Sequence, residues 1–153
     1  MSLRALLWAA LTTAGMTLAL APARGGVSGL VVLQSRATAS LPGAGNSAVY
    51  LTIHNAGSQA DRLLSASSPQ AAKVEMHATM MMSGGMAKMH SLSAIDVPLG
   101  GTVSMAPGGT HLMVTGAKQP LQAGGKLSLT LQFEKAGAMT IAVPIVSASE
   151  LAR

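Results

Sequence analysis

Cysteine is absent from the 153-residue chain. A protein without cysteine has no disulfide framework, so side-chain packing must hold its fold together. The same absence removes thiolate ligands, and with them the blue-copper class of metal site. Any metal chemistry in this chain must therefore use other donors.

Aromatic and charged residues are also scarce, at 2% and 10% of the chain. After the first 23 residues the aromatic side chains are Tyr50 and Phe133, and the basic residues behind the formal charge of +5 are scattered singly. Nucleic-acid binding normally shows a basic patch, often with interleaved aromatic residues. We therefore expect no nucleic-acid partner, although a mildly basic surface would favour an acidic partner or membrane.

Long apolar runs are limited to the start of the chain. Residues 1–23, "MSLRALLWAALTTAGMTLALAPA", carry one early positive charge at Arg4, an apolar run over 5–20 and the small-residue sequence Ala21-Pro22-Ala23. This layout predicts a secretory signal peptide cleaved after Ala23. A membrane anchor is the alternative, but the run is short and has no charged stop on its far side. We expect a periplasmic protein with no membrane span after cleavage.

The remaining chain, 24–153, has the length of one domain and is dominated by strand patterns. "SAVYLTIHN" (47–55) and "KLSLTLQFE" (126–134) alternate apolar and polar residues, as half-buried antiparallel strands do. Further strands are expected over 29–36 and 138–146, and Gly- or Pro-containing turns separate the runs. The pattern predicts an all-β antiparallel sandwich of immunoglobulin-like type, without a helix of ten residues.

Methionine is the abundant residue, with eleven in the chain. Five of them crowd into 80–89, namely Met80, Met81, Met82, Met86 and Met89. A lone methionine in a strand usually fills a core, and Met76 has the phase for that. Two readings remain open for the run 80–82, which either packs or forms an exposed fringe of soft-metal donors.

Two histidines lie in strands with the phase of the polar face. In "GGTHLMVTG" (108–116), His111 and Met113 are two positions apart and share one face of a strand. In "KVEMHAT" (73–79), His77 likewise falls on the face away from the core. The other two histidines, His54 and His90, are interpreted as ordinary solvated side chains.

A turn at Ser83-Gly84-Gly85 would fold the methionine-rich segment back on itself. With the turn centred near Ser83, Met89 lies roughly opposite His77, at the short Cβ spacing of cross-strand partners. The sequence leaves the register of this hairpin open by about one residue. In another register, Met86 takes the place of Met89 as the ligand. The predicted metal ligands are thus His77, Met89, His111 and Met113.

Two imidazoles and two thioethers form a soft, neutral donor set. Thioether sulfur selects Cu(I) over harder divalent ions, and imidazole binds copper in either oxidation state. Binding should weaken as the pH falls through the usual imidazole pKa of about 6.5, because protons then compete for the nitrogens. Methionine also avoids the disulfide chemistry of an oxidising compartment, although sulfoxide formation threatens it.

The spacing of these residues resembles a known signature. His77, eleven residues, Met89, twenty-one residues and then His111-Leu112-Met113 are similar to the H(M)X10MX21HXM pattern of the periplasmic PCu(A)C copper chaperone family. The resemblance extends over about residues 30–146, including "GGMAKMHSL" and "GGTHLMVTGAKQPLQAGGKLSLTLQFE". One departure is Ala78, where the family often has a second methionine.

The resemblance implies a cupredoxin-like β-sandwich that binds one Cu(I) and passes it on. The family typically delivers copper towards the CuA centre of cytochrome c oxidase, often together with a Sco-type protein. We further expect the carrier to be a monomer and to have no catalytic activity of its own.

Three rival readings stay open on the residues alone. A copper enzyme or electron carrier would need ligands that hold Cu(II) comfortably, and the chain offers four histidines in all. A copper buffer or scavenger for tolerance would use the same four ligands, and only the fate of the metal would distinguish it. A plain adhesion-type sandwich would use its methionines for packing alone.

Overall fold

A computed structural model describes residues 29–41 and 43–153, and the predicted signal peptide lies outside the described residues. The described part of the chain forms ten strands and one short helix, α1 (Ala148–Leu151). The strands are β1 (Leu30–Thr38), β2 (Ser47–Asn55), β3 (Asp61–Ser67), β4 (Ala71–Met81), β5 (Ala87–Ser91), β6 (Ile95–Val97), β7 (Thr102–Ser104), β8 (Thr110–Ala117), β9 (Lys126–Phe133) and β10 (Gly137–Val146).

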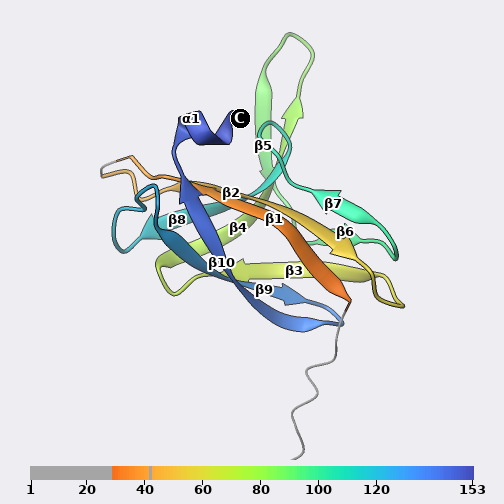
Figure 1. Ribbon diagram of the computed structural model, residues 1–153. Coiled ribbons are helices and arrows are strands. Elements are labelled where there is room, and N and C mark those ends of the chain that lie inside the picture. Colours follow the sequence, from red (N-terminus) through yellow and green to blue (C-terminus); the bar gives the residue numbers. More distant parts are fainter. Residues whose placement is uncertain (1–28, 42) are drawn as a thin grey trace, which may run out of the picture.

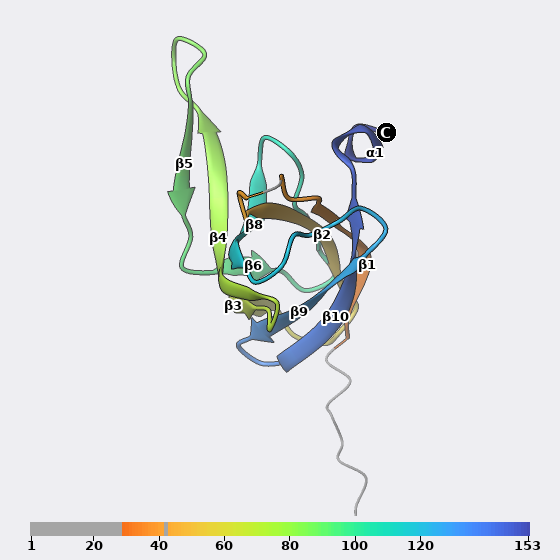
Figure 2. The same cartoon turned by 90° about the vertical axis from the view of Figure 1, so that its left-hand side faces the viewer.

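The strands pair in the order β5-β4-β8-β2-β1-β10-β9-β3-β6, with β7 added alongside β2. Every pairing is antiparallel except a short parallel one between β1 and β10, so the sheet is mixed. Strands β5, β4, β8, β2 and β1 form one layer, and β10, β9, β3 and β6 curve round to face it (Figures 1 and 2). The all-β prediction is confirmed.

One hydrophobic core fills the space between the layers. Strand β2 buries alternate residues, as the pattern over 47–55 predicts, and β9 does the same with its leucines. The largest fully buried side chains come from both layers and are Phe133, Leu51, Ile53, Leu63, Leu112, Leu127, Leu129, Leu131, Val49, Val97, Val114 and Val143. The strands of the first layer therefore have one face fixed against the core and the other free for chemistry.

Strands β4 and β5 form a hairpin that extends beyond the two layers (Figures 1 and 2). Strand β4 pairs with β8 up to Ala78 and then continues to Met81 with β5 as its partner. The predicted turn is present, with Gly84 and Gly85 at φ values of 92° and 78°. Glycine adopts this left-handed backbone without the Cβ clash that other residues meet.

Candidate metal centre

The pairing of β4 with β8 places His77 directly opposite His111. The two ring centroids are 5.9 Å apart, and the planes meet at 76°. Directly paired residues in an antiparallel sheet project to the same face. Two imidazoles from distant parts of the sequence therefore meet on the outer face of the first layer.

Both predicted sulfur ligands lie on the same face as the histidines. Met113 is two residues beyond His111 in β8 and pairs with Glu75, which is two residues before His77 in β4. Met89 in β5 pairs with Thr79, two residues after His77. Because side chains alternate with a period of two, these even separations place all four predicted ligands on one face of the sheet.

The register of the hairpin differs from the predicted one by two residues. His77 pairs with Ser91, so Met89 lies diagonal to His77 instead of opposite it. An even shift leaves Met89 on the histidine face, whereas Met86 falls on the other face of the hairpin. The alternative prediction, in which Met86 takes the place of Met89 as a ligand, is therefore wrong for this register.

His111 is buried, with 6% of its surface exposed. Its Nδ1–H donates to the Gly109 carbonyl oxygen at 3.1 Å, which leaves the lone pair on Nε2. The ring of Tyr50 lies 6.2 Å away, and burial raises the pKa of that phenol, so Tyr50 stays neutral. A backbone carbonyl that fixes one ring nitrogen is the usual way to orient an imidazole towards a metal.

His77 lies near a carboxylate. Its Nε2 lies 3.9 Å from Glu75 Oε2, and Lys73 Nζ contacts Glu75 Oε1 at 2.6 Å. The hydrogen bond from Lys73 lowers the pKa of Glu75, so the carboxylate stays ionised beside the ring of His77.

Nδ1 of His77 is buried and has no hydrogen-bond partner within the described part of the chain. A buried polar atom without a partner carries a free-energy cost and calls for a functional explanation. A metal ion bound between His77 and His111 would supply that partner. The donor set fits Cu(I) because both nitrogens and both sulfurs are neutral and the sulfurs are soft.

Thioethers are the further donors available to such a site. Across residues 29–41 and 43–153, no three side chains of His, Asp or Glu gather into a metal-ligating group. Met113 is half-buried beside His111, whereas Met89 is 54% exposed on the hairpin. A centre that used both sulfurs would therefore have a partly buried side on β8 and an open side on β5.

Sequence reasoning assigned no role to Tyr50, Glu75 or Gly109. For Glu75 a signal existed, since it lies two residues before His77 and so shares its strand face. The contact of Tyr50 with His111 depends on the pairing of β2 with β8, which the sequence does not specify. The carbonyl of Gly109 carries no sequence signal at all.

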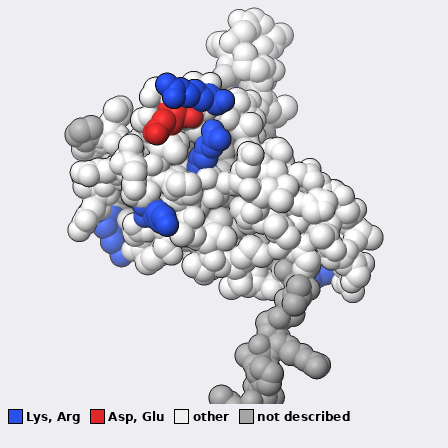
Figure 3. Space-filling view, viewed as in Figure 1, with Lys and Arg blue, Asp and Glu red and all other residues white. Residues whose placement is uncertain are grey.

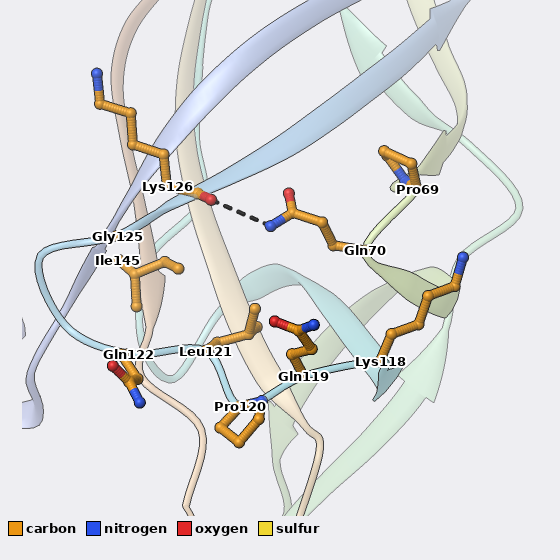
Figure 4. A pocket seen from close by; sticks show the side chains of 10 residues that line it. All are labelled: Pro69, Gln70, Lys118, Gln119, Pro120, Leu121, Gln122, Gly125, Lys126 and Ile145. Carbon is orange, nitrogen blue, oxygen red and sulfur yellow. Dashed lines mark hydrogen bonds between the residues drawn. The ribbon is translucent and has the colours of Figure 1, made fainter.

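The other histidines lie apart from this centre. His54 Nδ1 is 2.9 Å from Thr102 Oγ1, and His90 is exposed on the reverse side of the hairpin. A hollow of about 570 Å³ lies elsewhere, between the loops that flank β4 and β9 (Figure 4). Glutamine, lysine and proline side chains line much of it, and Gln70 Nε2 donates there to the Lys126 carbonyl at 3.3 Å. With no histidine or methionine in its lining, this hollow does not resemble a copper site.

The model of the family described as "Putative lipoprotein LpqE-like" matches residues 30–145. The chain belongs to the LpqE-like family. A curated relative, "Putative lipoprotein Lxx21020" from Leifsonia xyli subsp. xyli, is 34% identical over 111 residues. That match covers 72% of this chain and 67% of the relative.

Solved structures connect this LpqE-like chain with PCuAC domains. The apo PCuAC domain from PmoF1 is 27% identical with a TM-score of 0.67, and the copper-bound PCuAC domain from PmoF2 is 26% identical with a TM-score of 0.65. Each match covers 78% of this chain, and 94% and 93% of the respective domains. CuI-DR1885 from Deinococcus radiodurans is 28% identical with a TM-score of 0.59, over 74% of this chain and 75% of that one. The predicted PCu(A)C resemblance is confirmed, and the fold is PCuAC-like.

The part of the chain that the structure describes contains no helix with the length and apolar character needed to cross a bilayer.

Glu75 provides a first test of the centre. Replacing it by Gln keeps the size of the side chain but removes the negative charge that lies 3.9 Å from His77 Nε2. Loss of such an outer partner typically weakens metal binding by 10- to 100-fold, and we expect about 10-fold because Glu75 is partly solvated. Competition for Cu(I) with a chromogenic chelator measures the change. Glu134→Gln, which removes an exposed carboxylate on the far layer, should leave the affinity unaltered.

Proposed function

We propose that this protein binds one Cu(I) ion through His77, Met89, His111 and Met113. The observation that carries the proposal is the direct cross-strand pairing of the two histidines, with both sulfurs on the same face. The orphaned Nδ1 of His77 and the fixed tautomer of His111 support it. The similarity to a copper-bound PCuAC domain and to CuI-DR1885 supports the choice of metal.

The protein acts as a metallochaperone and has no catalytic activity of its own. Met89, exposed on the projecting hairpin, is the ligand that an acceptor reaches first. Neutral thioether donors can be exchanged one at a time for the thiolates or imidazoles of a partner, so copper transfers without being released. The half-buried side of the site on β8 retains the ion until the exchange is complete.

The acceptor that we propose is the CuA centre of cytochrome c oxidase, with a Sco-type protein as a further copper partner. Such a route lies outside the cytoplasm, in the periplasm. The predicted signal peptide and the lipoprotein description of the family and its relative support this location.

A transfer experiment tests the carrier role. The purified protein is loaded with less than one equivalent of Cu(I), mixed anaerobically with the copper-free CuA domain, and separated by size. We expect copper to elute with the acceptor, and we expect no specific transfer to a CuA domain whose ligands have been replaced. Copper that stays on this protein would contradict delivery and favour the alternative, a periplasmic buffer or scavenger for copper tolerance.

A further inference from the structure

The two faces of the β4–β5 hairpin carry different sets of residues. Pairs from His77↔Ser91 to Met81↔Ala87 fix the register, and Met82 N–H donates to the Met86 carbonyl at 2.7 Å, which extends the pairing to the turn. The histidine face therefore carries His77, Thr79, Met81, Ala87, Met89 and Ser91. The reverse face carries Ala78, Met80, Met82, Met86, Lys88 and His90.

The reverse face starts in the core and then leaves it. Met76, on the same side of β4, is 5% exposed, whereas Met80, Met82 and Met86 are 55%, 48% and 71% exposed. The hairpin extends past the two layers at this point, so no core remains for these side chains to fill (Figures 1 and 2). Core packing, the ordinary explanation for methionine in a strand, does not apply to them.

The register brings these three thioethers close to one another. Met82 and Met86 are cross-strand partners, with an expected Cβ separation of about 4.5–5.5 Å. Met80 is two residues before Met82 in β4 and is the diagonal neighbour of Met86, within reach of a long flexible side chain. The register therefore makes three soft thioether side chains neighbours on one face of the hairpin tip.

The charge around the tip selects against hard cations. Residues 81–87 contain no charged side chain, and no charge is visible on the projecting end of the hairpin in Figure 3. The nearest charge on the reverse face is Lys88, opposite Met80. A neutral set of thioethers beside an ammonium group has little affinity for a divalent ion that prefers oxygen ligands, whereas a soft monovalent ion is bound mainly through the sulfurs.

We propose that Met80, Met82 and Met86 form a second site for Cu(I) or Ag(I) on this reverse face. It is separate from the His77–His111 centre, because the two sets project from opposite faces of the same hairpin. It binds more weakly than that centre, since its three proposed donors are all thioethers and it lies beside Lys88. The site does not depend on the proposed carrier function.

Stoichiometry tests the second site directly. Anaerobic titration of the purified protein with Cu(I), and with Ag(I) as a redox-stable probe, should show two equivalents of different affinity. The triple variant Met80→Leu, Met82→Leu, Met86→Leu keeps the apolar bulk but removes the sulfurs, and it should bind one equivalent. Met81→Leu, on the histidine face of the same hairpin, is the matched control and should bind two.

Methyl NMR locates each equivalent. With ¹³C-labelled methionine methyl groups, the first equivalent should shift Met89 and Met113, and the second should shift Met80, Met82 and Met86. The buried Met76 and Met105 should remain unchanged and report that the variants are folded. His77→Ala with His111→Ala should lose the first equivalent and keep the second, so failure of the proposed function is distinguishable from failure of the second site.

Two outcomes would overturn the inference. One is a single equivalent in the wild-type protein with no second set of methyl shifts. The other is a triple variant that still binds two equivalents, or that loses both, because either result would show that these sulfurs do not form a separate site.

Discussion

Replacement of His111 by alanine is expected to weaken Cu(I) binding at the histidine centre by more than about 100-fold, equivalent to about 2.7 kcal/mol. Removing an outer partner of a ligand already weakens metal binding by up to about 100-fold, and loss of a ligand exceeds that. His111 is the most strongly fixed of the four, since it is buried and hydrogen-bonded to the Gly109 carbonyl. Competition with a high-affinity Cu(I) chelator measures the loss.

The chain supplies its own controls for this experiment. His54→Ala removes an imidazole at the far end of β2, and His90→Ala removes one on the reverse face of the hairpin. Neither should change the affinity of the first equivalent by more than a few-fold. An unchanged affinity in His111→Ala, or an equal loss in His54→Ala, would contradict the proposed centre. The interpretation in which the methionines serve only for packing would then be favoured.

The part of the site that the sequence predicts depends on strand periodicity. His111 and Met113 share a face because they are two residues apart, and burial of Leu112 and Val114 fixes which face that is. The same argument gives the face on which His77 lies, because the adjacent Met76 is buried in the core. A shift of one residue in either strand would expose core side chains, so the core determines the phase of these ligands.

Burial and strand periodicity do not predict the register of the β4–β5 hairpin. Residues 80–91 are exposed on both faces, so burial does not distinguish a turn centred on Ser83 from one centred on Gly84. The left-handed backbone at Gly84 and Gly85 decides the register instead. Met89 therefore lies beside Thr79, diagonal to His77, whereas Met80, Met82 and Met86 lie on the other face of the hairpin.

The surroundings of the histidines depend on pairings between distant segments, which composition does not reveal. Tyr50 reaches His111 only because β2 lies next to β8, and the parallel pairing of β1 with β10 is likewise a property of the topology. Sequence patterns predicted individual strands well, including 47–55 without error in its bounds. They did not predict their order in the sheet.

Replacement of Phe133 by alanine is expected to lower the free energy of unfolding by about 3–5 kcal/mol. Phe133 is the single phenylalanine of the chain, is 1% exposed and pairs with Leu63 across β9 and β3. With no disulfide to support the fold, the loss would be a large share of the total of about 5–15 kcal/mol for a typical domain. Urea unfolding of the copper-free protein measures it, and Phe133→Leu, which leaves a smaller cavity, should lose less.

The same variant separates the scaffold from the site. Phe133 lies in the layer opposite the histidine centre, so the folded fraction of Phe133→Ala should bind Cu(I) with unchanged affinity. Cu(I) at a free concentration 100 times its Kd should then restore about 2.7 kcal/mol of stability, because the ion binds the folded state. At the same free Cu(I) concentration, His111→Ala should gain almost no stability from its weakened histidine centre. If Phe133→Ala instead lost affinity in proportion to its stability, the core and the site would form one cooperative unit, and ligand geometry alone would not explain binding.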